Sequence, residues 1–458
     1  MSRTSSDSRS AAGPFDRDHR GTTLGLLALV TMFAFEAVAV SLAMPSVARD
    51  LHGESLYPIG VIGLLTAAIV GMVVGGIWGD ARGASGPLVL GGVGFVLGLV
   101  LSGLASTMPL FVAGRLVQGL TGGAALTSMY VAVADAYPVA LRPRVFSLFA
   151  TAWVLPSIVG PFVAGALVDL LTWRSVFLVV AGFAALNVVV VRVSMHRHLV
   201  HRDAPLRWGR RPAYALVAAT GVLCLHLAGQ GTGLRTALLL VAGLAALSVS
   251  LGPLLPRGTL RFARGLPAVI ALRGVFGAAF ACEEIFLPLV LQHESGISPT
   301  MTGLVMMVGA LGWTAGSAYA GRRVRPDTYG RLLATGSACL LGGALVLVAL
   351  VPLERQTVAA AVVATVGYAT MAVGMGLATP LTSTLSLDLA EPGRQGESGA
   401  AIQMSDSLGQ SLAAGLVGAV FARWYLLDPH TSYLSGFGLA VLLGLLATLV
   451  VRRATPSR

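Results

Sequence analysis

Residues 21 to 48 form a stretch of 28 residues in which Glu36 is the only charged residue. A helix rises ~1.5 Å per residue, so a stretch of this length can cross the ~30 Å hydrocarbon core of a bilayer. An ionisable group at that depth costs roughly 2.5–3.5 kcal/mol on insertion scales, and it usually faces a cavity or a partner. Glu283 and Glu284 interrupt another apolar stretch late in the chain. Carboxylates in both halves predict a pathway for protons or cations.

The composition identifies an integral membrane protein. Of the 458 residues, 55% are apolar and only 11% are charged, and the mean hydropathy is +0.81, whereas a soluble domain carries about 25% charged residues. The net charge of +11 is spread over short gaps between apolar stretches, with no long basic arm. We therefore expect no nucleic-acid partner, and a soluble multidomain enzyme is excluded.

The apolar stretches predict an all-α protein with about 14 transmembrane helices. The expected spans are 21–48, 58–79, 86–106, 109–136, 145–170, 173–191, 213–229, 236–254, 266–292, 299–321, 332–352, 356–379, 397–422 and 433–451. With the N-terminus inside, 24 of the 31 arginines fall in cytoplasmic gaps, five fall in outer gaps, and Arg115 and Arg273 lie within spans. This asymmetry supports both the number of spans and a cytoplasmic location of both termini.

One face of the fourth span is polar. Arg115, Gln118, Gly119 and Gly122 recur at spacings of three and four residues, which places them on one side of a helix. Arg115 lies about seven residues below the outer end, so it needs a carboxylate or carbonyl partner unless it snorkels outward. Arg273, near one end of its own span, is expected to snorkel or to anchor a gate.

Two further features are open to a structural or a functional interpretation. Pro156 and Pro161, which follows Gly160, remove backbone donors from the fifth span and predict a bend that either gates a cavity or is purely structural. Asp406 lies in a polar patch, 403–410, inside the thirteenth span, where it either bonds across helices or takes part in transport.

These residues carry a resemblance to the fourteen-helix drug:proton antiporters of the major facilitator superfamily. The first span resembles their motif Leu-Asp-x-Thr-Val-Val-Asn-Val-Ala-Leu-Pro, with Glu36 in place of the Asp. Arg115-x-x-Gln118-Gly119 resembles the Arg-x-x-Gln-Gly motif that the superfamily associates with proton coupling. The segment around Gly160 and Pro161 matches the antiporter motif Gly-x-x-x-Gly-Pro-x-x-Gly-Gly in part.

The loop after the second span resembles the Asp-Arg-x-Gly loop of the same superfamily. It keeps Asp80 and Gly83, but it lacks the expected Arg at position 81 and the basic pair after Gly83. These departures put the usual gate salt bridges in question.

The resemblance implies two pseudo-symmetric six-helix bundles with two linking helices between them. The expected division is a cytoplasmic tail at 1–20, a first bundle at 21–192, a basic connector with two extra helices at 193–265, a second bundle at 266–452 and a tail at 453–458. We expect a monomer in a bacterial inner or plasma membrane.

The expected function is proton-coupled export of a small hydrophobic or cationic molecule by alternating access. Glu36 would be the protonation site, Arg115 would tune it, and Glu284, Glu283, Asp406 and Gln118 would form a substrate site or a second titrating site. Gly160, Pro161, Asp80 and Gly83 would serve conformational change. The proton is the only coupling ion expected, with no cofactor and no metal.

Three alternatives remain open at this point. A metabolite symporter shares the fold and differs in transport direction. A lipid or glycolipid exporter would need a lateral opening. A membrane enzyme would need clustered His, Asp or Cys at one membrane face, and the trio His196, His198 and His201 in the basic connector is a weak candidate.

Glu283 and Glu284 cannot point in one direction, because adjacent helical residues differ by about 100°. Like charges this close oppose joint ionisation, so one of the two is expected to be protonated at neutral pH. We expect Glu284 to face the central cavity.

Overall fold

The computed structural model describes residues 13–53, 56–195, 202–229, 233–323, 327–353, 357–424 and 428–454. Within these ranges the chain is almost entirely helical and has no strand. The α-helices are α1 (Arg20–Asp50), α2 (Tyr57–Arg82), α3 (Ser85–Gly103), α4 (Met108–Ala136), α5 (Arg142–Thr151), α6 (Val154–Leu170), α7 (Trp173–Met195), α8 (Arg211–Ala228), α9 (Leu234–Leu254), α10 (Leu266–Leu289), α11 (Pro299–Arg323), α12 (Tyr329–Val348), α13 (Thr357–Asp388), α14 (Gln395–Trp424) and α15 (Pro429–Ala454). Three short helical turns, η2 (Val139–Leu141), η3 (Thr259–Arg261) and η4 (Val290–Glu294), lie between them.

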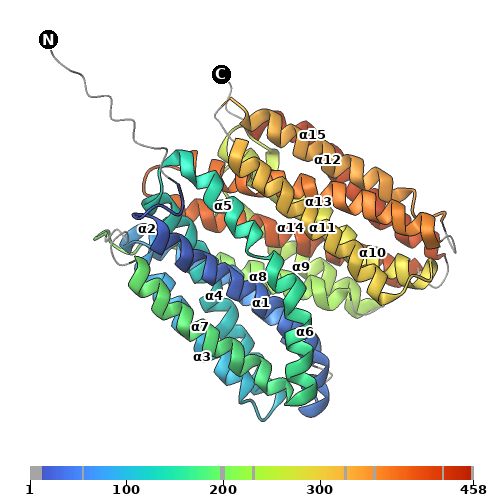
Figure 1. The fold of residues 1–458 in the computed structure, drawn as a ribbon, viewed down its shortest axis with the longest axis horizontal. Coiled ribbons are helices and arrows are strands. Elements are labelled where there is room, and N and C mark those ends of the chain that lie inside the picture. The colour runs from blue at the N-terminus through green and yellow to red at the C-terminus, as the bar shows by residue number, and fades with distance from the viewer. Residues whose placement is uncertain are drawn as a thin grey trace.

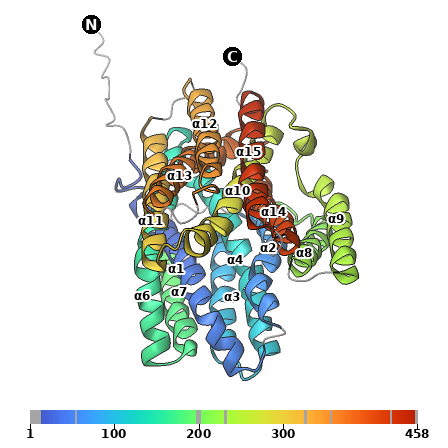
Figure 2. The same cartoon turned by 90° about the vertical axis from the view of Figure 1, so that its right-hand side faces the viewer.

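The helices form two bundles with the same packing scheme (Figures 1 and 2). In the first bundle, α1 to α7, the helix α4 packs on α2 and α3. In the second bundle, α10 to α15, the corresponding helix α13 packs on α11 and α12. This repetition confirms the predicted fold class of two related bundles. The exact domain boundaries at 192/193 and 265/266 stay a prediction.

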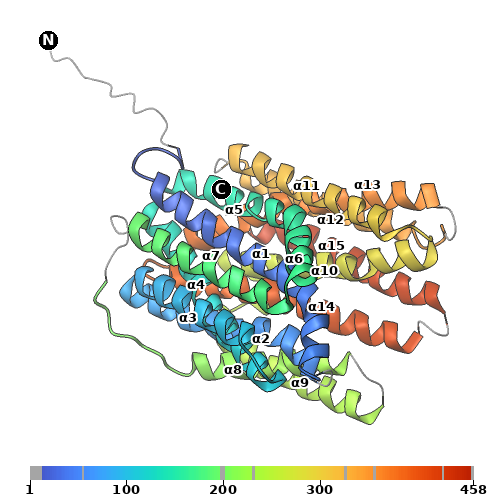
Figure 3. The same ribbon diagram turned by 60° about the horizontal axis from the view of Figure 1, so that its bottom comes forward.

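The two linking helices, α8 and α9, lie beside both bundles rather than inside either. They pack on each other, and α8 also contacts α2 of the first bundle and α14 of the second. Figures 2 and 3 show the pair along one flank of the molecule.

Among the residues that the structure describes, thirteen segments are long and apolar enough to cross a membrane, and the helix α14 is not one of them. This helix has 30 residues, which is long enough to span, but it carries Glu397, Gln403, Asp406 and Gln410. It packs along α10 and touches α2 and α4 of the other bundle. The polar residues that lower its hydropathy therefore lie on a helix at the centre of the structure.

Glycines allow the helices of the first bundle to pack closely. A Cβ atom at Gly71 of α2 would lie 2.0 Å from the carbonyl oxygen of Leu120, and one at Gly119 of α4 would lie 2.1 Å from that of Leu64. Any larger residue would push the backbones apart, as expected where van der Waals packing holds transmembrane helices together.

The fifth span is broken, which corrects the prediction of one helix over 145–170. It consists of α5 and α6, separated at Ala152 and Trp153. Pro156 has no N–H to donate to the carbonyl of Ala152, four residues earlier, and the break occurs at that position. The predicted bend is therefore present, and it takes the form of two separate helices.

The helix α13 continues through Asp388, nine residues beyond the predicted end at 379. Pro380 lies inside it and leaves the carbonyl of Gly376 without its usual helical donor. The Ser317 hydroxyl of α11 donates to that carbonyl at 2.9 Å. A neighbouring helix thus supplies the missing hydrogen bond, and the helix continues past the proline.

Candidate functional site

Glu36 of α1 and Arg115 of α4 form a buried ion pair. Glu36 is only 3% exposed and Arg115 only 6%. Nη1 of Arg115 donates to Oε1 of Glu36. Nε of Arg115 also donates to the carbonyl of Gly60 in α2 at 3.2 Å. An isolated buried charge would be very costly, so each member of this pair depends on the other.

Gln118 extends this pair into a network. Its Oε1 accepts a 2.7 Å hydrogen bond from Nη1 of Arg115, and its Nε2 donates to the Ser102 hydroxyl of α3 at 3.0 Å. The network thus joins one face of α4 to α1, α2 and α3. The opposite charges of Glu36 and Arg115 thus lie inside a network of polar side chains from three helices.

The structure separates the two adjacent glutamates of α10. Glu283 is fully buried, and neither of its carboxyl oxygens has a hydrogen-bond partner among the described residues. Glu284 is exposed. It lies seven residues after Gly277 and eleven after Arg273, which at about 100° per residue places all three on one face of α10.

Asp406 of α14 lies against that face. Its Oδ2 accepts a 2.9 Å hydrogen bond from Nη2 of Arg273, and a Cβ at Gly277 would lie 2.3 Å from its Oδ1. Glu284 is close enough to interact electrostatically with Asp406. Arg273 is only 7% exposed, so it does not snorkel, and its expected role as the anchor of a gate stays a prediction. It bonds across helices to Asp406.

Tyr130 of α4 brings the first bundle to this cluster. Its hydroxyl donates to Oε1 of Gln403 in α14 at 3.0 Å and shares a 3.2 Å hydrogen bond with the Ser383 hydroxyl of α13. It also interacts electrostatically with Arg273 and Asp406. Polar side chains from both bundles therefore meet at one place.

Asp80 of α2 caps a helix of the other bundle. Its two carboxyl oxygens accept hydrogen bonds from the backbone N–H groups of Gly396 and Glu397, at 2.6 and 2.8 Å. These groups belong to the first turn of α14, where the helix leaves N–H donors unpaired and favours a negative charge. Gly83 follows with φ 84°, a conformation that favours glycine, and ends α2.

Gly160 and Pro161 lie on α6, where that helix meets α1. A Cβ at Gly160 would lie 3.1 Å from Cγ1 of Val38. The rest of α6 is poorly covered, as the 78% exposure of Phe162 shows. The helix α6 thus contacts α1 closely at Gly160, while much of its remaining surface is exposed.

Further ion pairs join the elements at the end of the molecule that carries the start of α1 and the end of α15. Arg142 of α5 donates to Oδ1 of Asp388 in α13 at 2.7 Å, which links the two bundles. Arg211, the first residue of α8, pairs with Glu397 of α14. Figure 1 shows the bundles close together at this end and diverging toward the other.

The connector before α8 is also attached at this end. Arg202 donates to Oδ1 of Asp135 in α4 at 2.6 Å and to the carbonyl of Gly79 at 3.4 Å. Neither this contact nor the hydrogen bonds of Tyr130 could be predicted from the sequence. Only Asp135 and Asp388, which lie at the ends of α4 and α13, indicated contacts of this kind in the sequence. A carboxylate at the end of a transmembrane helix needs a cation as its partner.

No three His, Cys, Asp or Glu side chains within the described ranges are grouped so that they could hold a metal ion. His196, His198 and His201 lie outside the described residues.

The protein-family model of the Major Facilitator Superfamily matches residues 24–414 of this chain. The chain is similar to "Multidrug resistance protein 3" of Bacillus subtilis, with 23% identity over 87% of this chain and 78% of that protein. It is also similar to "Drug efflux pump JefA" of Mycobacterium tuberculosis, with 27% identity over 84% and 77% of the two chains.

Among solved structures, the human organic anion transporter MFSD10 has the same fold. Its TM-score is 0.67 at 15% identity, and the alignment covers 93% of this chain and 98% of that one. The family match covers the first bundle from residue 24 and the second bundle as far as residue 414 in α14, and it includes Glu36, Arg115 and Asp406. This protein is thus a multi-pass membrane protein that belongs to the major facilitator superfamily of transporters.

Proposed function

We propose that this protein exports a small hydrophobic or cationic molecule in exchange for protons, by alternating access between its two bundles. The observation that carries the proposal is the buried ion pair of Glu36 and Arg115, since a carboxylate with one buried cationic partner can couple a proton to a rearrangement of four helices. The printed names of the relatives, a multidrug resistance protein and a drug efflux pump, support export as the direction.

The second carboxylate group supports a cationic substrate. Glu284 is exposed on the face of α10 that also carries Arg273. It interacts with Asp406, whose charge is already balanced by Arg273 at 2.9 Å. Glu284 therefore has a negative charge available for a substrate cation, and a proton and such a cation would compete for it.

The arrangement of the bundles supports alternating access. With the termini in the cytoplasm, as the arginine distribution predicts, the end closed by Asp80, Arg142 and Arg211 is the cytoplasmic one. Opening this end requires these contacts to break while the opposite end closes, which is a rocking motion of two rigid bundles.

Transport by the purified protein in liposomes tests the proposal. Tetraphenylphosphonium serves as the cationic probe, and an acidic vesicle interior supplies an outward proton gradient. We expect accumulation of the probe that stops when an ionophore collapses the gradient. Accumulation that is the same with and without the gradient would show that protons do not drive transport.

A further inference from the structure

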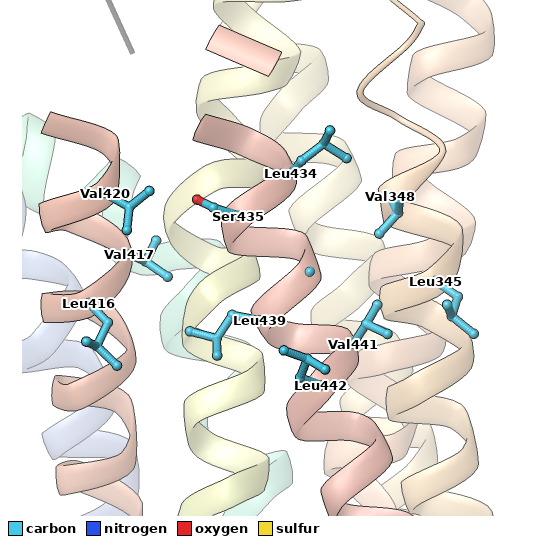
Figure 4. Close-up of a pocket in the computed structure, with 11 residues that line it drawn as sticks. Leu345, Val348, Leu416, Val417, Val420, Leu434, Ser435, Leu439, Val441 and Leu442 are labelled. Carbon is cyan, nitrogen blue, oxygen red and sulfur yellow. The ribbon is translucent and has the colours of Figure 1, made fainter. Parts of the chain in front are cut away.

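An apolar groove runs along the outer side of α14 and α15. Near the end that carries the termini, a cavity of 280 Å³ is lined by residues of α9, α10, α14 and α15 together with Phe262. Toward the other end, a cavity of 710 Å³ lies between α12, α14 and α15 (Figure 4). Leu416 and Leu439 line both cavities, so the two are neighbours along α14 and α15, and we refer to them together as the groove.

The groove is separate from the polar face of α10. Ala271, Gly274 and Ala278 face the groove. Arg273 follows Ala271 by two residues, so at about 100° per residue the two side chains point in nearly opposite directions. Glu284 shares the direction of Arg273 and therefore also lies away from the groove. The groove is therefore distinct from the cluster that contains Asp406.

Five exposed arginines lie in the two segments at the end of the groove nearest the termini, which we call its mouth, and none of them is among the residues that line it. They are Arg257, Arg261 and Arg264 in the segment between α9 and α10, and Arg452 and Arg453 in the last turn of α15. The N–H of Gly265 donates to the carbonyl of Arg453 at 2.9 Å, which holds the two groups side by side.

These arginines lack acidic partners. Among the described residues, none of the five forms an ion pair, whereas Arg142, Arg174, Arg202 and Arg211 all do. The sequence contains no Asp or Glu in residues 204–282 or 429–458. The positive charge at the mouth is thus available for an anion from outside the chain.

The backbone places an aromatic ring at the same mouth. Phe262 has φ 52°, a left-handed conformation that is uncommon for a bulky residue, and its side chain lines the groove. Thr259 beside it is buried. The segment is folded onto the groove, so its arginines are held beside the opening.

We propose that this groove binds an anionic phospholipid of the surrounding membrane. The phosphate would lie among the five arginines, and an acyl chain would follow the leucines of α14 and α15. Arg452 and Leu439 are 13 residues apart, which is roughly 20 Å along a helix at ~1.5 Å per residue. One leaflet contributes about 15 Å of hydrocarbon plus its headgroup layer, so the spacing fits one lipid. Basic pockets between transmembrane helices on the cytoplasmic side are known to take anionic headgroups.

Native mass spectrometry of the full chain in detergent tests the proposal, with phosphatidylglycerol and phosphatidylcholine as probes. The variant R257Q/R261Q/R264Q removes three arginines from the mouth. The matched control R322Q/R323Q/R331Q removes three exposed arginines from α11 and α12 at the same end of the molecule, away from the groove. Ala278→Leu fills the groove and leaves every arginine in place.

We expect the unmodified protein to bind phosphatidylglycerol roughly tenfold more tightly than phosphatidylcholine, since each arginine near an anionic headgroup contributes to binding. The mouth variant should lose this preference and the control should keep it. Ala278→Leu should weaken the binding of both lipids. If the mouth variant does not fold, R452Q/R453Q should reduce the preference in the same direction.

Three results would overturn the proposal. Equal binding of the two lipids would mean that the arginines do not select a headgroup. An equal loss in the mouth variant and the control would indicate general surface attraction. Undiminished phosphatidylglycerol binding by Ala278→Leu would show that the acyl chain does not occupy the groove.

Discussion

Arg202, in the connector between α7 and α8, donates a 2.6 Å hydrogen bond to Asp135 in the last turn of α4. The last turn of α2 lies beside this contact, because the N–H of Ala204 donates to the carbonyl of Ala81 at 3.1 Å. Ala81 stands where the resembling loop motif has an arginine. The guanidinium of Arg202 therefore lies near position 81, where this chain lacks the arginine of the motif. These contacts attach the connector to the first bundle.

The connector also reaches the second bundle. Arg211 follows Arg202 by nine residues and pairs with Glu397 at the start of α14. Glu397 is adjacent to Gly396, whose N–H donates to Asp80. The segment 202–211 thus forms a strap across the closed end.

We predict that Arg202→Gln weakens this strap and shifts the protein toward opening at the closed end. The side chain of Asp135 is only 8% exposed, so loss of its charged partner should cost about 1–3 kcal/mol. Spin labels at positions 144 and 323, on α5 and α11, would report the separation of the bundles. We expect longer distances in the variant.

Arg207→Gln is the matched control, since Arg207 is exposed and belongs to the same connector. Distances that are identical in Arg202→Gln, Arg207→Gln and the unmodified protein would contradict a role for the strap.

We predict that Glu36→Gln abolishes transport driven by a proton gradient while the protein still folds. A glutamine retains an oxygen that can accept from Arg115, but it cannot exchange a proton. Glu36→Ala should be less stable, because breaking a buried pair costs roughly 3–5 kcal/mol. Gradient-driven uptake of tetraphenylphosphonium and thermal unfolding measure the two effects.

Asp169→Asn controls for the loss of a carboxylate, because Asp169 is an exposed residue of α6. Gradient-driven uptake should persist in this control. Uptake by Glu36→Gln at the rate of the unmodified protein would refute the assignment of Glu36 as the coupling residue.

The meeting of Glu36 and Arg115 could be anticipated from the sequence on physical grounds. An arginine inside an apolar span needs a carboxylate or a carbonyl, and Glu36 is the only charged residue of another apolar span. The two bundles and the linking helices followed from the lengths of the apolar stretches and from the resemblance. A buried charge that needs a partner and an apolar stretch long enough to span the membrane can each be recognised from a single residue or a single helix.

The contacts that the sequence did not indicate are those between distant segments without periodicity. Arg202 and Asp135 are 67 residues apart, and Tyr130 and Gln403 are 273 residues apart. A tyrosine in an apolar helix gives no indication of which hydroxyl partner it will find. Bonding of Asp406 across helices was one of two predicted alternatives, but its partner Arg273 was not predicted, because Arg273 lies near the end of its span and was expected to snorkel or to anchor a gate.

The orientation of the protein can be tested by cysteine labelling. With Cys224, Cys282 and Cys339 replaced, we predict that Ser298→Cys reacts with an impermeant thiol reagent added outside intact cells and that Arg207→Cys does not. Ser298 precedes α11 and is exposed, and Arg207 lies in the connector at the opposite end. The arginine asymmetry of 24 to five motivates this prediction. Reaction of the cysteine at 207 from outside would reverse the orientation.

The last prediction is that Glu283 and Glu284 have different functions. Glu283 is fully buried and its carboxyl oxygens have no hydrogen-bond partner among the described residues. An ionised carboxylate there would have nothing to offset its loss of hydration. Glu283→Gln should therefore preserve transport. Glu284 is exposed on the face that carries Arg273. Glu284→Gln should reduce transport of a cation by about tenfold or more, since a charged contact contributes roughly 1.5–3 kcal/mol.

The two variants should be compared with tetraphenylphosphonium as the cation and with an uncharged hydrophobic compound. Glu284→Gln should lose the cation and retain the neutral compound, because only the cation requires the negative charge. Each variant serves as the control for the other, since both replace one carboxylate by an amide in the same turn of α10. A selective loss of the cation in Glu283→Gln would exchange the two roles. Identical profiles in both variants would mean that neither glutamate selects the charge of the substrate, and the choice of substrate would then depend on the neighbouring Asp406 and Arg273.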